Sequence, residues 1–182
     1  VNIDGFAKVN EAIPSTMTKG DFLKFSVDVL EGYMIYSVKV NGYPDINANR
    51  HFYYCVTEDL VIDMVIKPID YILDYEYLTI SDQLITYFNG MNSEYVNFPS
   101  EDSLGNPIIG FKDDIIPLSI INNPYSSILS SDTTHNQDII HLGFTSNMTH
   151  VPVVDKKYNS LESINIPEGV LTMGGIEETP KL

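Results

Sequence analysis

Histidines and aspartates gather in one stretch of the sequence, and these side chains are the ones that most often bind metals or transfer protons. The stretch 132–155 holds three of the four histidines and three aspartates: His135, His141, His150, Asp132, Asp138 and Asp155. Their spacings match no zinc motif, and they fall in a polar part of the chain. We therefore expect surface histidines here and no tightly bound zinc or other cofactor.

Motifs for other chemistry are missing from the sequence. There is no G-x-S-x-G, P-loop, H-E-x-x-H or C-x-x-C. The acidic pairs 101–102 and 113–114 lack the D-x-D-x-D-G spacing of calcium loops. Cys55 lies in the aromatic run "HFYYCV" with no base nearby, as expected of an inert buried thiol. Asn147-Met148-Thr149 fits the glycosylation sequon, a triplet that also arises by chance. We predict no catalytic residues and keep an enzyme as a remote alternative.

Composition excludes several classes of protein. The chain has 182 residues, of which 43% are hydrophobic and 19% charged, so it can bury a core. Its longest apolar run is "FYYCV", whereas a membrane-spanning helix needs about twenty residues. A formal charge of −15 argues against binding nucleic acid and is otherwise a source of solubility. No signal peptide is visible in the sequence. Because the chain opens with Val1 and not with Met, we expect that an initiator Met or a leader has been lost or that the chain was excised from a longer one.

The elements that would position these side chains begin with antiparallel strands. Four segments in the first seventy residues alternate apolar and polar side chains, namely 22–30, 34–40, 51–56 and 60–67. Asn41-Gly42 is a strong signal for a tight hairpin turn. The alternation predicts that these residues share the buried faces of three of the strands: Leu23, Phe25, Val27, Val29, Met34, Tyr36, Val38, Val40, Leu60, Ile62, Met64 and Ile66.

Residues 1–68 resemble the divergent internalin-type B-repeat, a small module of bacterial surface proteins. The resemblance rests on "KGD" at 19–21, "EGY" at 31–33, "VKVNG" at 38–42 and the "TED" turn at 57–59. Tyr36 stands where that family often has Trp. These are turn and core residues, so the resemblance implies a fold and no chemistry.

A different period follows the first seventy residues. Segments of the form apolar-x-apolar begin at Val96, Leu118, Ile140 and Ile164, at intervals of 22, 22 and 24 residues. A period in the low twenties is typical of leucine-rich repeats, in which each turn is too small to bury its own apolar face. Stacked turns would place these pairs inside: Val96/Phe98, Leu118/Ile120, Ile140/Leu142 and Ile164/Ile166.

Parts of this region resemble BspA-like leucine-rich repeats of bacterial surface antigens. The segments that carry the resemblance are 79–90, 96–100 and 161–174. The two middle repeats are degenerate, and Pro117 would remove a backbone donor beside a predicted strand. An irregular loop over 112–150 is therefore the alternative.

Together these patterns predict a mainly β chain. We expect a small antiparallel β module followed by a short, degenerate leucine-rich-repeat-like β solenoid. The predicted parts are a B-repeat-like module at 1–68, a connector at 69–76, the repeat region at 77–176 and a tail at 177–182.

Two surfaces of the predicted solenoid are candidate sites. The residues between the buried ones would form a column on the open sheet, made of Asn97, Ser119, His141 and Asn165, which is either a binding surface or a solvated face without a partner. The last turn would be left open, so Ile164, Ile166 and Val170 are candidates for an assembly contact. The expected partners are other protein chains, in a homo-oligomer or larger particle. A host-surface protein or a glycan is the alternative partner.

Two classes of function follow from these expectations. The first is a non-catalytic binding or structural module of an extracellular, adhesin-like bacterial surface protein. The alternative is a bacteriophage virion component for capsid decoration, a head fibre or tail attachment. The surface-antigen resemblances favour the first class, whereas the lack of a visible leader and of paired cysteines favours the second.

Overall fold

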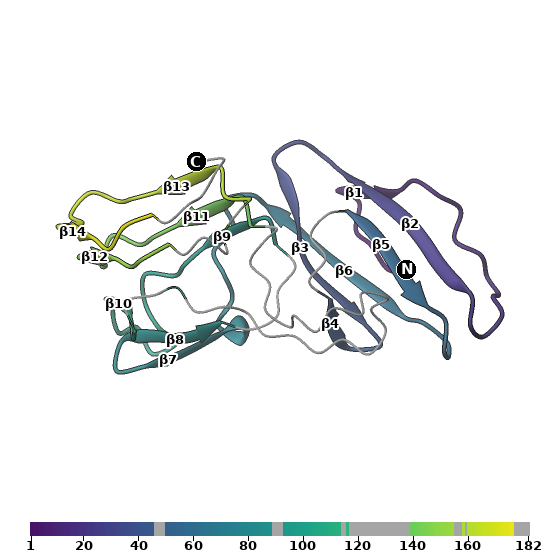
Figure 1. Cartoon of the computed structure of the whole chain (residues 1–182), viewed down its shortest axis with the longest axis horizontal. Coiled ribbons are helices and arrows are strands. Elements are labelled where there is room, and N and C mark those ends of the chain that lie inside the picture. The colour runs from purple at the N-terminus through teal and green to yellow at the C-terminus, as the bar shows by residue number, and fades with distance from the viewer. Residues whose placement is uncertain are drawn as a thin grey trace. The chain divides into compact units, whose positions relative to one another are not determined.

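The computed structural model describes residues 1–45, 50–88, 93–113, 116, 139–154, 158 and 160–176. These residues form many short strands and no α-helix, which confirms the prediction of a mainly β chain with small antiparallel sheets (Figure 1). The chain divides into two compact units between Ile69 and Asp70. The N-terminal unit is 1–69 together with Ser93, and the C-terminal unit contains the other described residues from Asp70 onward.

The N-terminal unit consists of two three-stranded antiparallel sheets. The first has the order β1-β2-β5, with strands Ala7–Val9, Phe22–Val29 and His51–Cys55. The second has the order β4-β3-β6, with strands Tyr43–Asp45, Tyr33–Val40 and Ile62–Pro68. The chain therefore changes sheet between β2 and β3, between β4 and β5, and between β5 and β6.

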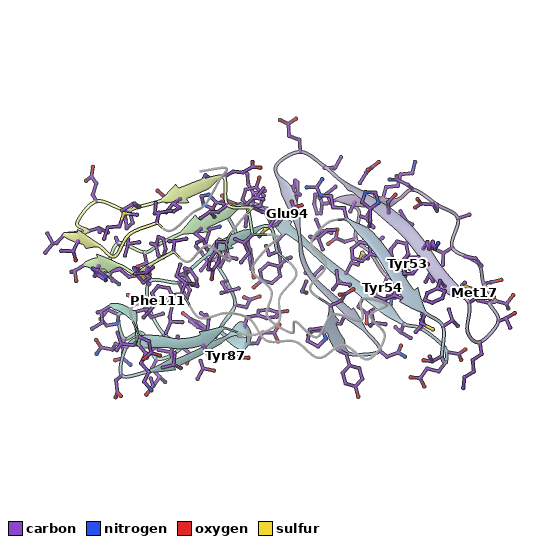
Figure 2. The ribbon with its side chains drawn as sticks, viewed as in Figure 1. Met17, Tyr53, Tyr54, Tyr87, Glu94 and Phe111 are labelled. Atoms are coloured by element: carbon purple, nitrogen blue, oxygen red, sulfur yellow. The ribbon has the colours of Figure 1, made fainter. Side chains whose placement is uncertain are left out.

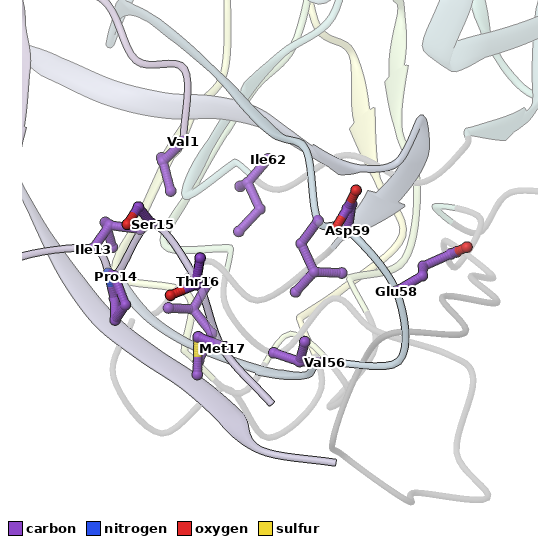
Figure 3. A pocket seen from close by; sticks show the side chains of 12 residues that line it. Val1, Ile13, Pro14, Ser15, Thr16, Met17, Val56, Glu58, Asp59 and Ile62 are labelled. Atoms are coloured by element: carbon purple, nitrogen blue, oxygen red, sulfur yellow. The ribbon is translucent and has the colours of Figure 1, made fainter. Parts of the chain in front are cut away.

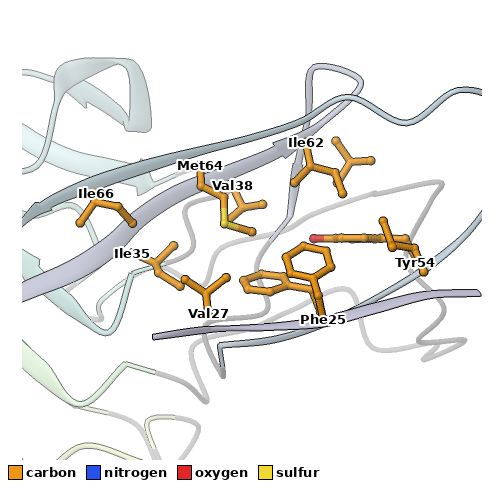
Figure 4. Packing of buried hydrophobic residues seen from close by; sticks show 11 residues of the cluster. Phe25, Val27, Ile35, Val38, Tyr54, Ile62, Met64 and Ile66 are labelled. Carbon is orange, nitrogen blue, oxygen red and sulfur yellow. The ribbon is translucent and has the colours of Figure 1, made fainter. Parts of the chain in front are cut away.

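A single apolar cluster lies between these two sheets (Figure 4). β2 and β6 bury alternate residues, as the sequence predicted, and Val29 and Leu60 pack at the margin of the cluster. Phe25 stacks on Phe52 with ring centroids 5.1 Å apart. The buried members are Leu23, Phe25, Val27, Ile35, Val38, Val40, Phe52, Tyr54, Ile62, Met64 and Ile66.

β3 departs from the predicted alternation. Its pairing with β6 shifts between Ile35 and Ser37, which is the mark of a β-bulge. The bulge places Ile35 in the cluster with Val38 and Val40. Met34 and Tyr36 are buried outside this cluster, so the prediction that they share a face with Val38 was wrong. The hydroxyl of Ser93 lies 3.0 Å from the sulfur of Met34.

Two local features fix the edges of the second sheet. Asn41 and Gly42 join β3 to β4 with φ angles of 48° and 82°, which confirms the predicted tight turn. The Asn41 side chain also accepts the Val61 N–H at 2.7 Å. Near the start of the chain, Asn2 donates its N–H to the Ile62 carbonyl at 2.7 Å and accepts the Met64 N–H at 2.9 Å. These two bonds form a parallel bridge between Asn2 and Asp63, which lie 61 positions apart in the sequence.

The C-terminal unit begins with a hairpin. A 3-10 turn at Tyr75–Tyr77 (η1) leads into β7 (Leu78–Ser81), which pairs antiparallel with β8 (Leu84–Phe88). β8 also pairs, in parallel, with β10 (Gly110–Phe111).

Parallel pairing dominates the rest of this unit. β9 (Tyr95–Asn97), β11 (His141–Gly143) and β13 (Ser163–Asn165) form one sheet in the order β13-β11-β9. β12 (His150–Val151) pairs with β14 (Thr172–Met173). β11 joins β13, and β12 joins β14, at the same offset of 22 residues.

The predicted order of the repeats is wrong at one place. β9 pairs directly with β11 at an offset of 46 residues, so no turn built on Leu118 and Ile120 separates them. Leu118 and Ile120 themselves lie outside the described residues. The offset of 46 residues shows that the stretch between these two strands adds no strand to the sheet at this point.

The interior of the C-terminal unit follows the predicted pattern up to its last turn. Val96, Phe98 and Leu142 are buried, and Ile140 and Ile164 are half-buried. Ile166 is 43% exposed, so its predicted place inside was wrong. It directly follows β13, which lies at the edge of its sheet among the described strands. Three aromatic rings pack together in this interior, those of Phe98, Phe111 and Phe144.

Candidate functional site

The predicted column of polar residues is split by the actual register of the strands. Leu142 lies opposite both Val96 and Ile164, whereas the sequence interval had aligned Val96 with Ile140. Asn97 and Asn165 therefore share a column with Gly143. His141 belongs to a neighbouring column with Tyr95 and Ser163. Ser119 lies outside the described residues.

Asn97 links neighbouring segments of backbone. Its side-chain amide donates to the Tyr71 carbonyl at 3.3 Å, and its own carbonyl accepts the Leu73 N–H at 2.8 Å. Gly143 leaves room for this side chain, because a Cβ at position 143 would overlap the Asn97 amide oxygen. The amide of Asn97 thus supports the parallel ladder.

Two histidines bond to hydroxyl groups one repeat further along the chain. Nδ1 of His141 lies 2.7 Å from Oγ of Ser163, and Nδ1 of His150 lies 2.6 Å from Oγ1 of Thr172. Both pairs have the 22-residue offset of the strands that carry them. The sequence contained this signal, since each histidine precedes a hydroxyl residue by one repeat, but it becomes visible only when the repeat length is known.

Partial burial lowers the pKa of His141 below its ordinary value of 6.5. Because the neutral imidazole is favoured in the folded chain, this histidine stabilises the fold above pH 6.5 and stops doing so as the pH falls below it. We expect an NMR titration of the His141 ring to show a midpoint below that of the same ring in the urea-unfolded chain. A midpoint equal to or above the unfolded one would contradict this assignment.

The described residues contain no group of three His, Cys, Asp or Glu side chains that could hold a metal ion. Several members of the predicted histidine and aspartate stretch lie outside the described ranges, namely His135, Asp132, Asp138 and Asp155. Asp102 caps its own loop, where Oδ1 accepts the N–H groups of Leu104 and Asn106, each at 2.8 Å. Hydrogen bonds from the Asn106 side chain and from these backbone groups lower the pKa of Asp102. Its carboxylate therefore has a structural task within the loop.

Two other candidates from the sequence have structural surroundings. The Asn147 side chain of the sequon donates to the Ser100 carbonyl at 2.8 Å, and this bond uses the nitrogen to which a glycan would be attached. Cys55 is a free, half-buried thiol at the end of β5.

A recess of about 450 Å³ opens in the N-terminal unit between the segments 13–17 and 56–62 (Figure 3). Its lining residues are Val1, Ile13, Pro14, Ser15, Thr16, Met17, Leu23, Val56, Glu58, Asp59, Leu60 and Ile62. The carboxylate of Glu58 lies within 3.4 Å of the Asn41 amide and points away from the other labelled side chains. The lining contains no histidine or cysteine, so the recess offers no nucleophile paired with an imidazole base.

The last turn of the C-terminal unit presents a different kind of surface. β13 and β14 each lie at the edge of their sheet among the described strands. Of the predicted assembly residues, Ile166 is exposed, while Ile164 and Val170 are half-buried. The sequence did not single out Leu171, Met173 and Ile176, which are 80%, 41% and 39% exposed. We call the strands β13 and β14 together with Ile166, Leu171, Met173 and Ile176 the open edge.

Figure 2 draws the described side chains on the ribbon, and its labels mark Tyr53 and Tyr54 on β5, Tyr87 on β8 and Phe111 on β10. Comparison with models of protein families, with curated proteins and with solved structures gave no match. In the described part of the chain, no helix has the length and hydropathy needed to cross a bilayer.

Proposed function

We propose that this chain is a non-catalytic binding or structural module of a bacterial cell-surface, adhesin-like protein. In this proposal the C-terminal unit is a short β solenoid of the leucine-rich-repeat type, and its turns present surfaces to other macromolecules. The observation that carries the proposal is the 22-residue offset, which recurs in three parallel pairings. They join His141 to Ser163, His150 to Thr172 and Val154 to Ile176.

The repeat of side-chain contacts supports a solenoid beyond the pairing of strands. The same residue type, histidine, bonds to a hydroxyl one turn later at two separate places on the turn. Repeated turns of this size bury a core only by stacking, and proteins built from them commonly act as binding surfaces. A scaffold of this kind needs no catalytic group, in keeping with the structural tasks of Asn97, Asp102 and Asn147.

The open edge favours a second candidate function, a structural component of a bacteriophage virion. An exposed sheet edge with apolar side chains promotes aggregation of a free protein, whereas in a subunit of a particle it can bind a neighbouring subunit. In this case the chain would serve in capsid decoration, a head fibre or tail attachment.

Immunogold electron microscopy with antibodies against the purified chain distinguishes these functions. We expect gold on the outer surface of intact cells of the source bacterium, and a strain lacking the gene serves as the control. Gold on purified phage particles and not on cells would replace the first function by the second. Gold confined to the interior of sectioned cells would contradict both.

A further inference from the structure

We propose that the N-terminal unit binds an extended segment of another polypeptide along one side of β2, through main-chain hydrogen bonds and one apolar side chain. The receiving groups are the backbone N–H and C=O groups of Phe22 and Lys24, and the side chain enters the recess beside them. This site makes no use of the stacked turns of the C-terminal unit. It therefore goes beyond the proposed function, and its failure would leave that function standing.

β1 covers only part of its side of β2. The pairing of the two strands ends with Val9 opposite Val27, after which Asn10 donates its N–H to the Ser26 carbonyl at 3.0 Å. The N–H of Ser26 bonds at 2.6 Å to the carboxylate of Glu11 and not to a backbone carbonyl. The Glu11 side chain thus ends the pairing, and the part of β2 before Ser26 is left without β1 beside it.

This part of β2 directs alternate backbone groups toward the uncovered side. Neighbouring residues of an antiparallel pair point their N–H and C=O groups to opposite sides. Because Ser26 points toward β1, Lys24 and Phe22 point to that side as well. Neither residue forms a main-chain bond there with any described residue. We call these groups of Phe22 and Lys24 the β2 edge, and groups of this kind bind an added strand.

The segment 13–17, which connects β1 to β2, would not compete for these groups. It forms no hydrogen bond with any residue in the described ranges. Two of its side chains, Ile13 and Met17, pack at the margin of the apolar cluster and hold it in place. An added strand therefore has no main-chain bond of this segment to break.

The recess lies beside the β2 edge. Leu23, the residue between the two that form the edge, is one of its lining residues. Leu23 and Ile62 are 6% and 1% exposed and belong to the apolar cluster, so the recess has an apolar floor. Figure 3 shows Met17 on one side of the recess and Val56 on the other. A side chain on an added strand would lie next to its cross-strand neighbours at this floor.

The β2 edge and the recess together specify the chemistry of the partner. Outward main-chain groups require an amide backbone, which an extended polypeptide supplies at the spacing of a strand. Side chains alternate along a strand, so an apolar side chain would enter the recess while its neighbours are polar and face water. A second copy fits less well, because pairing two β2 edges would bring both copies of segment 13–17 into one interface and the two Lys24 side chains close together.

The probe is the blocked pentapeptide acetyl-Thr-Val-Thr-Val-Thr-amide, added to the full, ¹⁵N-labelled chain and followed by NMR. We expect the amide signals of Phe22 and Lys24 to move as the peptide binds. The same peptide with its three central residues N-methylated keeps every side chain and loses main-chain donors on both sides. It should bind at least about fivefold more weakly. No movement at the β2 edge, or equal binding of the two peptides, would overturn the proposal.

Lys24→Pro tests the main-chain contact from the side of the protein, with Lys24→Ala as its matched control. Both variants lose the ammonium group, which lies 4.6 Å from the centre of the Tyr53 ring, and only proline also removes the N–H of the β2 edge. We expect the proline variant to bind the unmodified peptide about fivefold more weakly than the alanine variant. Equal binding by the two variants would contradict strand addition.

Leu60→Trp tests the recess and leaves the backbone of β2 unchanged, so it also decides the matter should the proline variant not fold. Leu60 lines the recess, whereas Val61 is 51% exposed and does not, which makes Val61→Trp the control. The larger ring at position 60 should weaken peptide binding about tenfold, the effect of losing one buried apolar side chain. A folded Leu60→Trp chain that binds the peptide as well as the control does would show that no side chain enters the recess.

Discussion

Tyr54→Phe should lower the free energy of unfolding of the N-terminal unit by about 2 kcal/mol, because it removes a hydrogen bond to a buried carboxylate. The Tyr54 hydroxyl donates to Oδ2 of Asp45, and the two residues are 1% and 2% exposed. Phenylalanine keeps the ring contacts with Phe25 and Phe52, so the loss comes from the hydroxyl alone. Urea denaturation followed by circular dichroism measures it.

The same variant should change the response of stability to alkaline pH. Burial, and next the charge of Asp45, raise the pKa of Tyr54 far above its ordinary value of 10.0. The hydroxyl therefore stays protonated in the folded chain while it ionises in the unfolded one. Its contribution to stability is complete below pH 10 and declines above it, by about 1.4 kcal/mol per pH unit. Tyr54→Phe should remove this part of the slope.

Tyr53→Phe is the matched control for both effects. Tyr53 lies next to Tyr54 on β5 but is 36% exposed, on the opposite face of the strand. We expect its loss to change stability by less than about 0.5 kcal/mol, as is usual for exposed positions. If the two variants had the same stability and the same slope above pH 10, the buried hydroxyl would not have the energy we assign to it.

Gly174→Ala should destabilise the last turn by about 2 kcal/mol through overpacking. A Cβ at this position would lie 2.8 Å from the backbone nitrogen of Val153 and 3.1 Å from the carbonyl carbon of Pro152. Backbone atoms cannot rotate away as a side chain can, so β14 would have to move from β12. Loss of amide protection at Thr172, with a lower urea midpoint, is the expected result.

Gly110→Ala provides the comparison for this prediction. Its Cβ would meet only the Leu84 side chain, at 3.6 Å, which is ordinary contact. Both glycines lie in or beside short parallel strands, so they differ mainly in the room available. Equal stability of the two variants would show that β12 and β14 are not as close as described.

Local patterns were sufficient to predict much of the N-terminal unit. Strands β2 and β6 alternate strictly, and Asn41-Gly42 has the residue types that its backbone angles require. The bulge near Tyr36 was missed, because it arises from the pairing of β3 with β6, and a sequence pattern does not record which residues of the partner strand are skipped.

The C-terminal unit shows a different limit. Its period of 22 residues was visible in the sequence, but a shift of two residues keeps the same side chains on the same face. The pattern therefore could not distinguish Ile140 from Leu142 as the partner of Ile164. Because Leu142 is the partner of Ile164, His141 lies outside the column that contains Asn97 and Asn165.

The sequence predicted only some of the residues of the open edge, because exposure at this edge also depends on which strands are neighbours. Ile166 and Val170 belong to the most regular repeat in the sequence, so they were recognisable as members of a last turn. Leu171 and Met173 look like core residues by composition, and their exposure depends on which strand lies beside them.

The bridge between Asn2 and Asp63 has a consequence for the order of events during synthesis. Asn2 leaves the ribosome before any of its partners exist, and its bonds to Ile62 and Met64 cannot form until β6 has emerged. β2 must likewise wait for β5, and β3 for β6. Contacts so distant in sequence slow the folding of a small domain. The nascent N-terminal unit therefore exposes its apolar strands until Pro68 has been made, and this interval is when a chaperone would have most to bind.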